Sequence, residues 1–202
     1  MIVKICGITT SEAAQAAVSA GADIIGFVFA ESKRRIDPEK AASIKSAIGG
    51  KVKVAGVFVN EEPAEINRIH GIVGLDYIQL HGEETQEYMD QMPSPVIKAF
   101  GVDSKERLLE AAAFSPDYYL FDSPKGKYRG GNGLSFDLSL MDGSAIPNNR
   151  VILAGGLTPE NVREAIERVN PAGVDVSSGV ETDGKKDIAK IHAFIKNAKQ
   201  TY

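Results

Sequence analysis

The only cysteine of the chain, Cys6, and the distant Asp122 each stand at the end of a short apolar run. "IVKIC" (2–6) ends on the thiol, and "DYYLF" (117–121) is followed directly by Asp122. A thiolate and a neutral carboxylic acid form a base–acid pair that can move a proton at carbon. Acyl transfer has less support, because no histidine lies close to Cys6 in the sequence. The pair predicts proton-transfer chemistry if the fold brings both groups to one pocket.

Both residues also have a structural explanation. A free cysteine is often a small buried apolar residue, and an aspartate after a strand often caps a helix or pairs with a cation. The chemistry is also demanding, because at pH 7 a normal thiol is ~3% ionised and a normal carboxyl ~0.1% protonated. The required state then lies ~6 kcal/mol uphill. A working site therefore needs a positive field or hydrogen-bond donors near Cys6.

Two glycine-containing turns late in the sequence are typical of phosphate binding. "LAGGLTPENV" passes through Gly155 and Gly156 into a helix that Thr158 is expected to cap, and "DVSSGVE" places Ser178 and Gly179 after the last apolar run. Glycine lets backbone N–H groups approach an anion, and a helix N-terminus attracts negative charge. Either turn alone could be a tight connection. The two together predict a phosphorylated small molecule as the partner.

A basic segment and a histidine follow two other apolar runs. "SKRRI" brings Lys33, Arg34 and Arg35 to the end of the run at 23–29, and "QLHG" places His81 just after another. A guanidinium fork suits a planar carboxylate, so either arginine is a candidate for binding an acidic part of the substrate. No carboxylate–histidine cluster has metal-ligand spacing at the ends of the runs, so no catalytic metal is predicted.

The runs that carry these residues are expected to be strands. They are apolar on both faces, as buried parallel strands are, and amphipathic helical stretches separate them. Eight strand–helix units predict an α/β fold, a single-domain parallel (βα)8 TIM barrel over residues 1–202. An open doubly wound sheet is the alternative, but the first turn, "CGITTSE", lacks its glycine pattern. The expected strands are 2–6, 23–29, 52–59, 75–80, 95–100, 117–121, 150–155 and 173–178.

A barrel would gather the candidate residues, because barrel active sites lie at the C-terminal ends of the strands. The ends of the first and sixth strands would then place Cys6 and Asp122 across one pocket. The glycine-rich segment 123–137 adjoins Asp122 and is expected to close over that pocket as a loop. A plain loop is the alternative for this segment.

Composition narrows the partners and the compartment. The 202 residues carry a net charge of −4, which gives no general attraction to nucleic acid or to an anionic membrane. One cysteine makes no internal disulfide, which favours a reducing compartment. No signal peptide is apparent, and no apolar run approaches the ~20 residues of a membrane helix. The chain is therefore expected to be cytoplasmic, in an oligomeric state that the sequence leaves open.

Motifs along nearly the whole chain resemble those of one known family. In order they are "KICGIT", "GADIIGFVF", "SKRRI", "GVFVN", "IQLHG", "FDS", "GGNG", "LAGGLTPENV" and "VDVSSGVE". The combination closely resembles the phosphoribosylanthranilate isomerases of tryptophan biosynthesis, whereas "AGG" or "SSG" alone would fit many barrels. The resemblance implies a (βα)8 barrel without a cofactor. It also implies an Amadori rearrangement of N-(5-phosphoribosyl)anthranilate to 1-(2-carboxyphenylamino)-1-deoxyribulose 5-phosphate.

The resemblance also implies roles for single residues. Cys6 matches the family's base and Asp122 its acid. Arg34 matches the arginine that holds the anthranilate carboxylate, and His81 matches a pocket histidine. Asp175 would lie near the sugar hydroxyls, and the "AGG" and "SSG" turns would cradle the phosphate.

Where many family members have an aromatic residue after this arginine, the chain has Arg35. Two other classes of protein remain as alternatives. A metal-dependent sugar-phosphate epimerase, or a related lyase, would need histidines and carboxylates converging on the strand ends. A non-catalytic phospholigand-binding module would keep the two glycine turns but would not need both Cys6 and Asp122.

Overall fold

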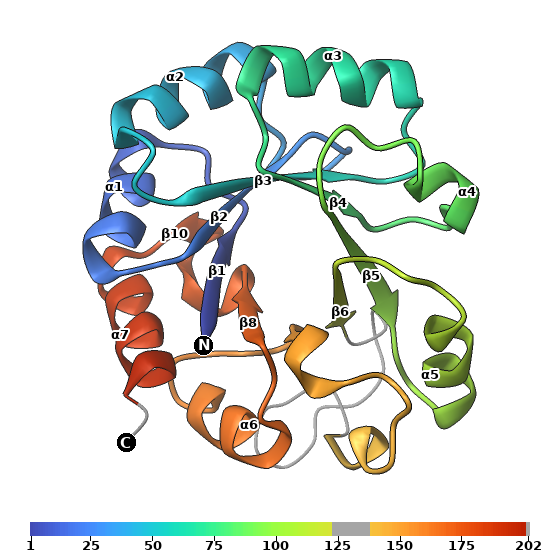
Figure 1. Cartoon of the computed structure of the whole chain (residues 1–202). Helices are drawn as coiled ribbons and strands as arrows, with labels where there is room; N and C mark the ends of the chain where they lie inside the picture. Colours follow the sequence, from blue (N-terminus) through green and yellow to red (C-terminus); the bar gives the residue numbers. More distant parts are fainter. Residues whose placement is uncertain (123–137, 201–202) are drawn as a thin grey trace.

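A closed barrel of eight parallel strands forms the centre of the protein (Figure 1). The computed structural model describes residues 1–122 and 138–200. The strands follow their order in the sequence, and β8 pairs with β1, which confirms the predicted (βα)8 barrel and excludes the open sheet. The strands are β1 (Ile2–Cys6), β2 (Ile24–Val28), β3 (Lys53–Phe58), β4 (Tyr77–Leu80), β5 (Val96–Gly101), β6 (Tyr118–Asp122), β7 (Val151–Leu153) and β8 (Gly173–Val176).

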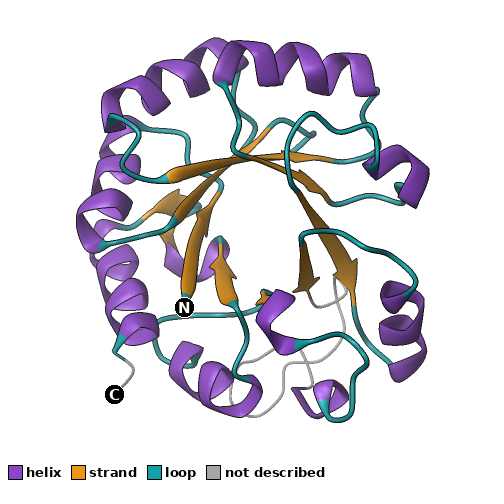
Figure 2. Cartoon of the chain, viewed as in Figure 1, coloured by secondary structure: helices purple, strands orange, loops and turns teal. Residues whose placement is uncertain are grey.

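Helices surround the barrel on its outside (Figure 2). Short 3-10 turns and a small hairpin of β9 and β10 complete the described elements. The helices are α1 (Ser11–Ala20), α2 (Pro38–Ile48), α3 (Pro63–Val73), α4 (Gln86–Met89), α5 (Lys105–Ala112), α6 (Val162–Val169) and α7 (Ile188–Lys199). The 3-10 turns are η1 (Leu138–Met141), η2 (Asn148–Arg150) and η3 (Ser178–Val180), and the hairpin strands are β9 (Glu181–Thr182) and β10 (Lys185–Lys186).

Capping residues set the ends of the first helix. The hydroxyl of Thr10 accepts a hydrogen bond from the N–H of Ala13, which satisfies a donor that the first turn leaves open. Gly21 ends the helix in the left-handed region, at φ 94°, which glycine adopts without a steric penalty.

The prediction that Thr158 is the N-cap of the helix after β7 is wrong. Helix α6 begins at Val162, and its N-cap residue is Asn161. The side chain of Asn161 instead accepts from the N–H of Thr158 at 2.8 Å and donates to the carbonyl of Gly156 at 3.0 Å. These two bonds fold residues 156–161 into a turn, so the segment after β7 is held in place without being helical.

The barrel interior has an apolar layer and a polar layer. One end is filled by a cluster of small and branched residues that includes Ala55, Leu120 and Ile152. Above it the interior contains buried polar residues, among them Lys4, Gln79 and Asp175. Because side chains on a strand alternate between its two faces, Lys4 and Cys6 of β1 point to the same side. The polar layer therefore lies directly beneath Cys6.

Candidate active site

Cys6 ends β1 and is nearly buried at the mouth of the barrel. Burial raises the pKa of its thiol above the ordinary value, and the nearby carboxylate of Asp175 raises it further. The ammonium groups of Lys4 and Lys186 act in the opposite direction and lower the pKa. The positive field that a thiolate base requires is therefore present beside this thiol, although the effect of burial on the pKa is larger.

Asp175 lies on β8, directly opposite Lys4 in the register of the two strands. Its carboxylate accepts a hydrogen bond from the Lys4 ammonium at 2.9 Å, and both side chains are buried. The structure thus places Asp175 in the polar layer below the mouth and engages it with a lysine. Sequence reasoning missed Lys4, although a charged residue two positions before Cys6 in an apolar strand was a usable signal.

Arg34 turns toward the mouth, whereas Arg35 is exposed. A Cβ on Gly7 would lie 2.5 Å from Cδ of Arg34, so the arginine stem packs on the bare backbone that follows Cys6. Gly7 also has φ 76°, in the left-handed region that favours glycine. This residue is therefore required twice, for its backbone conformation and for the close approach of the arginine.

The guanidinium of Arg34 is held by a carboxylate that the sequence did not indicate. Nε and Nη2 donate to the two oxygens of Glu181, each at 2.7 Å. Lys186 donates to the same carboxylate at 2.7 Å and to the carbonyl of Ser177 at 2.8 Å. Hydrogen bonds from these two cations outweigh burial and lower the pKa of Glu181. Glu181 therefore stays ionised and fixes the direction of the arginine fork.

Asp122 ends β6, and His81 follows β4. Nε2 of His81 lies 3.8 Å from Oδ2 of Asp122, and Nδ1 lies 3.4 Å from the side-chain nitrogen of Gln79. Burial lowers the pKa of His81 more than the Asp122 carboxylate raises it, so the ring is mainly neutral at pH 7. The structure therefore brings together the predicted acid and the predicted pocket histidine, on the opposite side of the barrel from β1 (Figure 1).

The two glycine turns meet beyond β7 and β8. Gly155 and Gly156 have φ 77° and 69°, and their N–H groups donate to no group in the described ranges 1–122 and 138–200. A side chain on Gly179 would collide with the carbonyl of Leu157, so the second turn packs directly on the first. Ser178 is exposed beside them. The turns offer open backbone donors of the kind that bind an anion.

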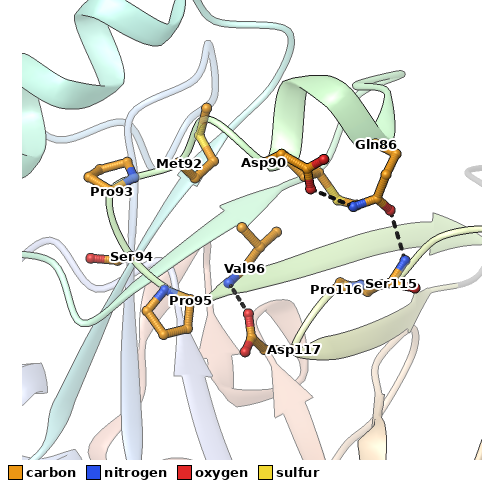
Figure 3. A pocket seen from close by; sticks show the side chains of 11 residues that line it. Gln86, Asp90, Met92, Pro93, Ser94, Pro95, Val96, Ser115, Pro116 and Asp117 are labelled. Atoms are coloured by element: carbon orange, nitrogen blue, oxygen red, sulfur yellow. Dashed lines mark hydrogen bonds between the residues drawn. The ribbon is translucent and has the colours of Figure 1, made fainter.

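One hollow adjoins these residues, and another lies at the far end of the barrel. A cavity of about 640 Å³ lies beside His81, and the packed rings of Phe100 and Phe114 form part of its lining. A pocket of about 380 Å³ lies at the opposite end of the barrel, before β5 and β6 (Figure 3). Gln86 there bonds both Asp90 and the N–H of Ser115, as the dashed lines show. The two acidic side chains of that pocket, Asp90 and Asp117, accept hydrogen bonds from Gln86 and from the N–H of Val96.

Other features of the described chain bear on the alternatives. No cluster of three or more histidine, cysteine or acidic residues suited to a metal ion occurs within 1–122 and 138–200. No helix in the part of the chain that the structure describes could cross a membrane. The predicted closing loop, 123–137, lies outside the described residues.

These features define a (βα)8-barrel enzyme. One mouth of the closed barrel has a thiol, a carboxyl–imidazole pair and two open glycine turns. The family model described as N-(5'-phosphoribosyl)anthranilate (PRA) isomerase matches residues 3–197. The chain belongs to this family, and the family is one of isomerases.

Relatives and solved structures are similar over full length. The N-(5'-phosphoribosyl)anthranilate isomerase of Oceanobacillus iheyensis is 49% identical over 201 residues, which is 99% of this chain and 98% of that protein. The corresponding Bacillus cereus protein is 48% identical over 199 residues, 98% of each. The crystal structure of the Thermotoga maritima enzyme is 44% identical, with a TM-score of 0.89 and full coverage of both chains. Another, 43% identical over all of both chains with a TM-score of 0.86, contains reduced 1-(o-carboxyphenylamino)-1-deoxyribulose 5-phosphate.

Proposed function

We propose that the chain isomerises N-(5'-phosphoribosyl)anthranilate to 1-(2-carboxyphenylamino)-1-deoxyribulose 5-phosphate, with Cys6 as the base and Asp122 as the acid. The observation that carries this assignment is the placement of both residues at the same mouth, at the ends of β1 and β6. Family membership over residues 3–197 supports the reaction. The reaction requires only proton transfers within one substrate, so no cofactor is needed.

The two residues act in sequence on the sugar. Asp122 gives its proton to the ring oxygen as the bond from that oxygen to C1 breaks, which leaves a protonated Schiff base. The Cys6 thiolate then removes the proton at C2, and the electrons of that bond neutralise the iminium as an enolamine. Tautomerisation of the enolamine gives the ketone. His81, 3.8 Å from Asp122, is placed to orient the carboxyl toward the ring oxygen.

Arg34 supports the recognition of the anthranilate carboxylate. Glu181 takes up Nε and Nη2 of the fork, and Nη1 makes no hydrogen bond within 1–122 and 138–200. The substrate carboxylate can therefore meet Nη1 while Glu181 keeps the guanidinium in place. The phosphate, at the other end of the substrate, fits the open N–H groups of the turns after β7 and β8. Asp175 then lies between these two ends of the site, where the ribose hydroxyls would be.

The cytoplasm is the location that we propose for this reaction. A thiol base loses its function when it is oxidised, and the cytosol keeps thiols reduced. The single cysteine of the chain is the residue that such a compartment would protect.

A turnover assay tests the proposed function. The anthranilate substrate is fluorescent, and its fluorescence disappears as the product forms. We expect purified protein to abolish the fluorescence catalytically, with a chelator present. Substrate that binds but persists would point instead to a phospholigand-binding module. Activity that the chelator abolishes would point to metal-dependent chemistry.

Gly156→Asp tests the phosphate site. The substitution adds bulk and a negative charge where the phosphate is proposed to bind, so we expect KM to rise at least tenfold with a smaller change in kcat. Gly143→Asp is the matched control, because Gly143 is also left-handed, at φ 76°, and has open space around it. A folded Gly156→Asp protein with the kcat/KM of this control would remove the phosphate from these turns.

Arg34→Ala and Arg35→Ala test which arginine binds the carboxylate. The Arg34 fork faces the mouth, so its loss should weaken substrate binding by ~1.5–3 kcal/mol, the value of a charge-assisted hydrogen bond. Arg35 is exposed, and its loss should change KM little. The KM ratio of the two variants is the measurement. Equal losses, or a larger loss at Arg35, would contradict the assignment.

A further inference from the structure

Lys4 is a fully buried cation in the middle of the barrel, with 0% of its surface exposed. Burying an ammonium is costly unless partners compensate for the lost water. Asp175 supplies one partner at 2.9 Å. An ammonium has three N–H groups, so the carboxylate leaves part of its donor capacity for other neighbours.

The other neighbour of Lys4 is the thiol of Cys6. Sγ of Cys6 and Nζ of Lys4 lie 2.9 Å and 3.2 Å from the point that a Cβ on Gly26 would occupy. Gly26 stands opposite Cys6 in the register of β1 and β2. The absence of a side chain at Gly26 therefore leaves room for both the sulfur and the ammonium beside β2, close enough for the two groups to interact. Each of the two groups favours the charged form of the other.

We propose that Lys4 is a positioning residue for Cys6: its buried ammonium holds the thiolate toward the mouth of the barrel, and Asp175 fixes the ammonium in turn. The inference rests on the proposed role of Cys6 as the base. Lys4 needs no proton transfer of its own, because it stays charged throughout and acts only through its field and its hydrogen bonds.

Other charged groups also face the thiol, and the test has to separate them from Lys4. Lys186 of β10 and Arg34 after β2 interact electrostatically with Cys6 from the rim, and Asp175 of β8 acts with the opposite sign. Lys186 and Arg34 share the Glu181 carboxylate, which offsets part of their charge. Among these cations, Lys4 has the largest effect on the thiol.

The competing explanation is a purely structural ion pair. Lys98 and Glu84 form such a pair, because Lys98 is buried and donates to Glu84 at 2.8 Å. No cysteine lies beside Lys98, since the only one in the chain is Cys6. This pair gives a matched control, with the same chemistry and burial but no thiol.

The experiment is an NMR titration of Cys6 in the full-length protein. Isotopic labelling of cysteine gives one Cβ resonance, because the chain has one cysteine, and its shift reports ionisation of the thiol without any substrate. We expect Lys4→Met to raise the pH needed to form the thiolate, so that the ionised fraction at a given pH falls about tenfold or more. In the control variant Lys98→Met/Glu84→Gln, the thiolate should form at the same pH as in the unaltered protein.

Lys4→Met leaves Asp175 buried without its cation, and that variant can fail to fold. The double variant Lys4→Met/Asp175→Asn removes both charges, and the thiolate fraction should still fall, because Lys4 influences the thiol more than Asp175 does. An unchanged titration in a folded Lys4 variant would overturn this inference and leave the proposed function intact. A thiolate fraction that falls with no loss of kcat/KM would overturn this inference and the assignment of Cys6 as the base, while the isomerase activity itself would stand.

Discussion

Cys6→Ser should lower kcat by ~10²–10⁴-fold and leave KM nearly unchanged. Serine keeps the shape of the side chain at the end of β1, but its hydroxyl is far too weak an acid to ionise beside Lys4 near neutral pH. The lost interaction belongs to the transition state in which the C2 proton moves, so substrate binding persists. Steady-state loss of anthranilate fluorescence measures both constants.

A buried structural cysteine would behave differently. Serine in its place would lower the free energy of unfolding and leave kcat unchanged. Ala55→Ser is the control for that effect, because Ala55 is a fully buried residue of the apolar layer inside the same barrel. It should cost stability without a comparable loss of rate. Near-normal kcat in folded Cys6→Ser would exclude Cys6 as the base.

Asp122→Asn should produce a loss of kcat of the same order, ~10²–10⁴-fold. The amide keeps the size of the carboxyl beside His81 but has no acidic proton to give to the ring oxygen, so the sugar ring opens slowly. Asp117→Asn is the matched control at the other end of the same strand segment, where Asp117 accepts the N–H of Val96 at 2.8 Å. That variant should lose stability and keep kcat/KM.

The pattern of strands was predictable because a parallel barrel buries both faces of each strand. The eight apolar runs therefore marked β1 to β8 to within a few residues. The first helix followed its capping signals at Thr10 and Gly21. The start of α6 did not: the helix begins at Val162, after a turn in which the Thr158 hydroxyl accepts from the N–H of Glu160 and the Asn161 side chain accepts from the N–H of Thr158.

At the site, the features that the sequence could not predict are contacts between residues far apart in the chain. Cys6 and Asp122 could be selected as candidates because each ends a strand, and barrel geometry alone brings strand ends together. The partner of Lys4 lies 171 residues away, so only the register of β1 against β8 identifies it as Asp175. Glu181 was missed because β9 and β10 are two residues long, too short for any periodic pattern.

The choice between Arg34 and Arg35 also needed the structure. Adjacent residues point in different directions, and the sequence does not say which one faces the pocket. The bare backbone of Gly7 settles the geometry, since it admits the stem of Arg34 next to Cys6.

The proposed acid and base roles have a joint consequence for the pH dependence of kcat/KM. The productive enzyme needs an ionised thiol and a protonated carboxyl at once. Burial raises the pKa of Cys6, whereas a carboxyl ordinarily titrates ~4–5 pH units below a thiol. Between the pKa values of the carboxyl and the thiol, a rise in pH increases the thiolate fraction and decreases the protonated-carboxyl fraction by the same factor, so the two effects cancel. Above the pKa of the thiol, the thiolate fraction no longer grows, and only the loss of protonated carboxyl continues. kcat/KM of the unaltered enzyme should therefore fall as Cys6 ionises.

The residual kcat/KM of Asp122→Asn from neutral to alkaline pH tests this account most directly. Without the acid, only the ionisation of the thiol remains, so the residual activity should rise with pH and follow the ionisation of Cys6 measured by NMR in the same variant. The expected rise of kcat/KM in this variant is thus opposite to the fall expected for the unaltered enzyme as Cys6 ionises. Residual activity that stays flat or falls while Cys6 ionises would contradict the assignment of Cys6 as the base and Asp122 as the acid.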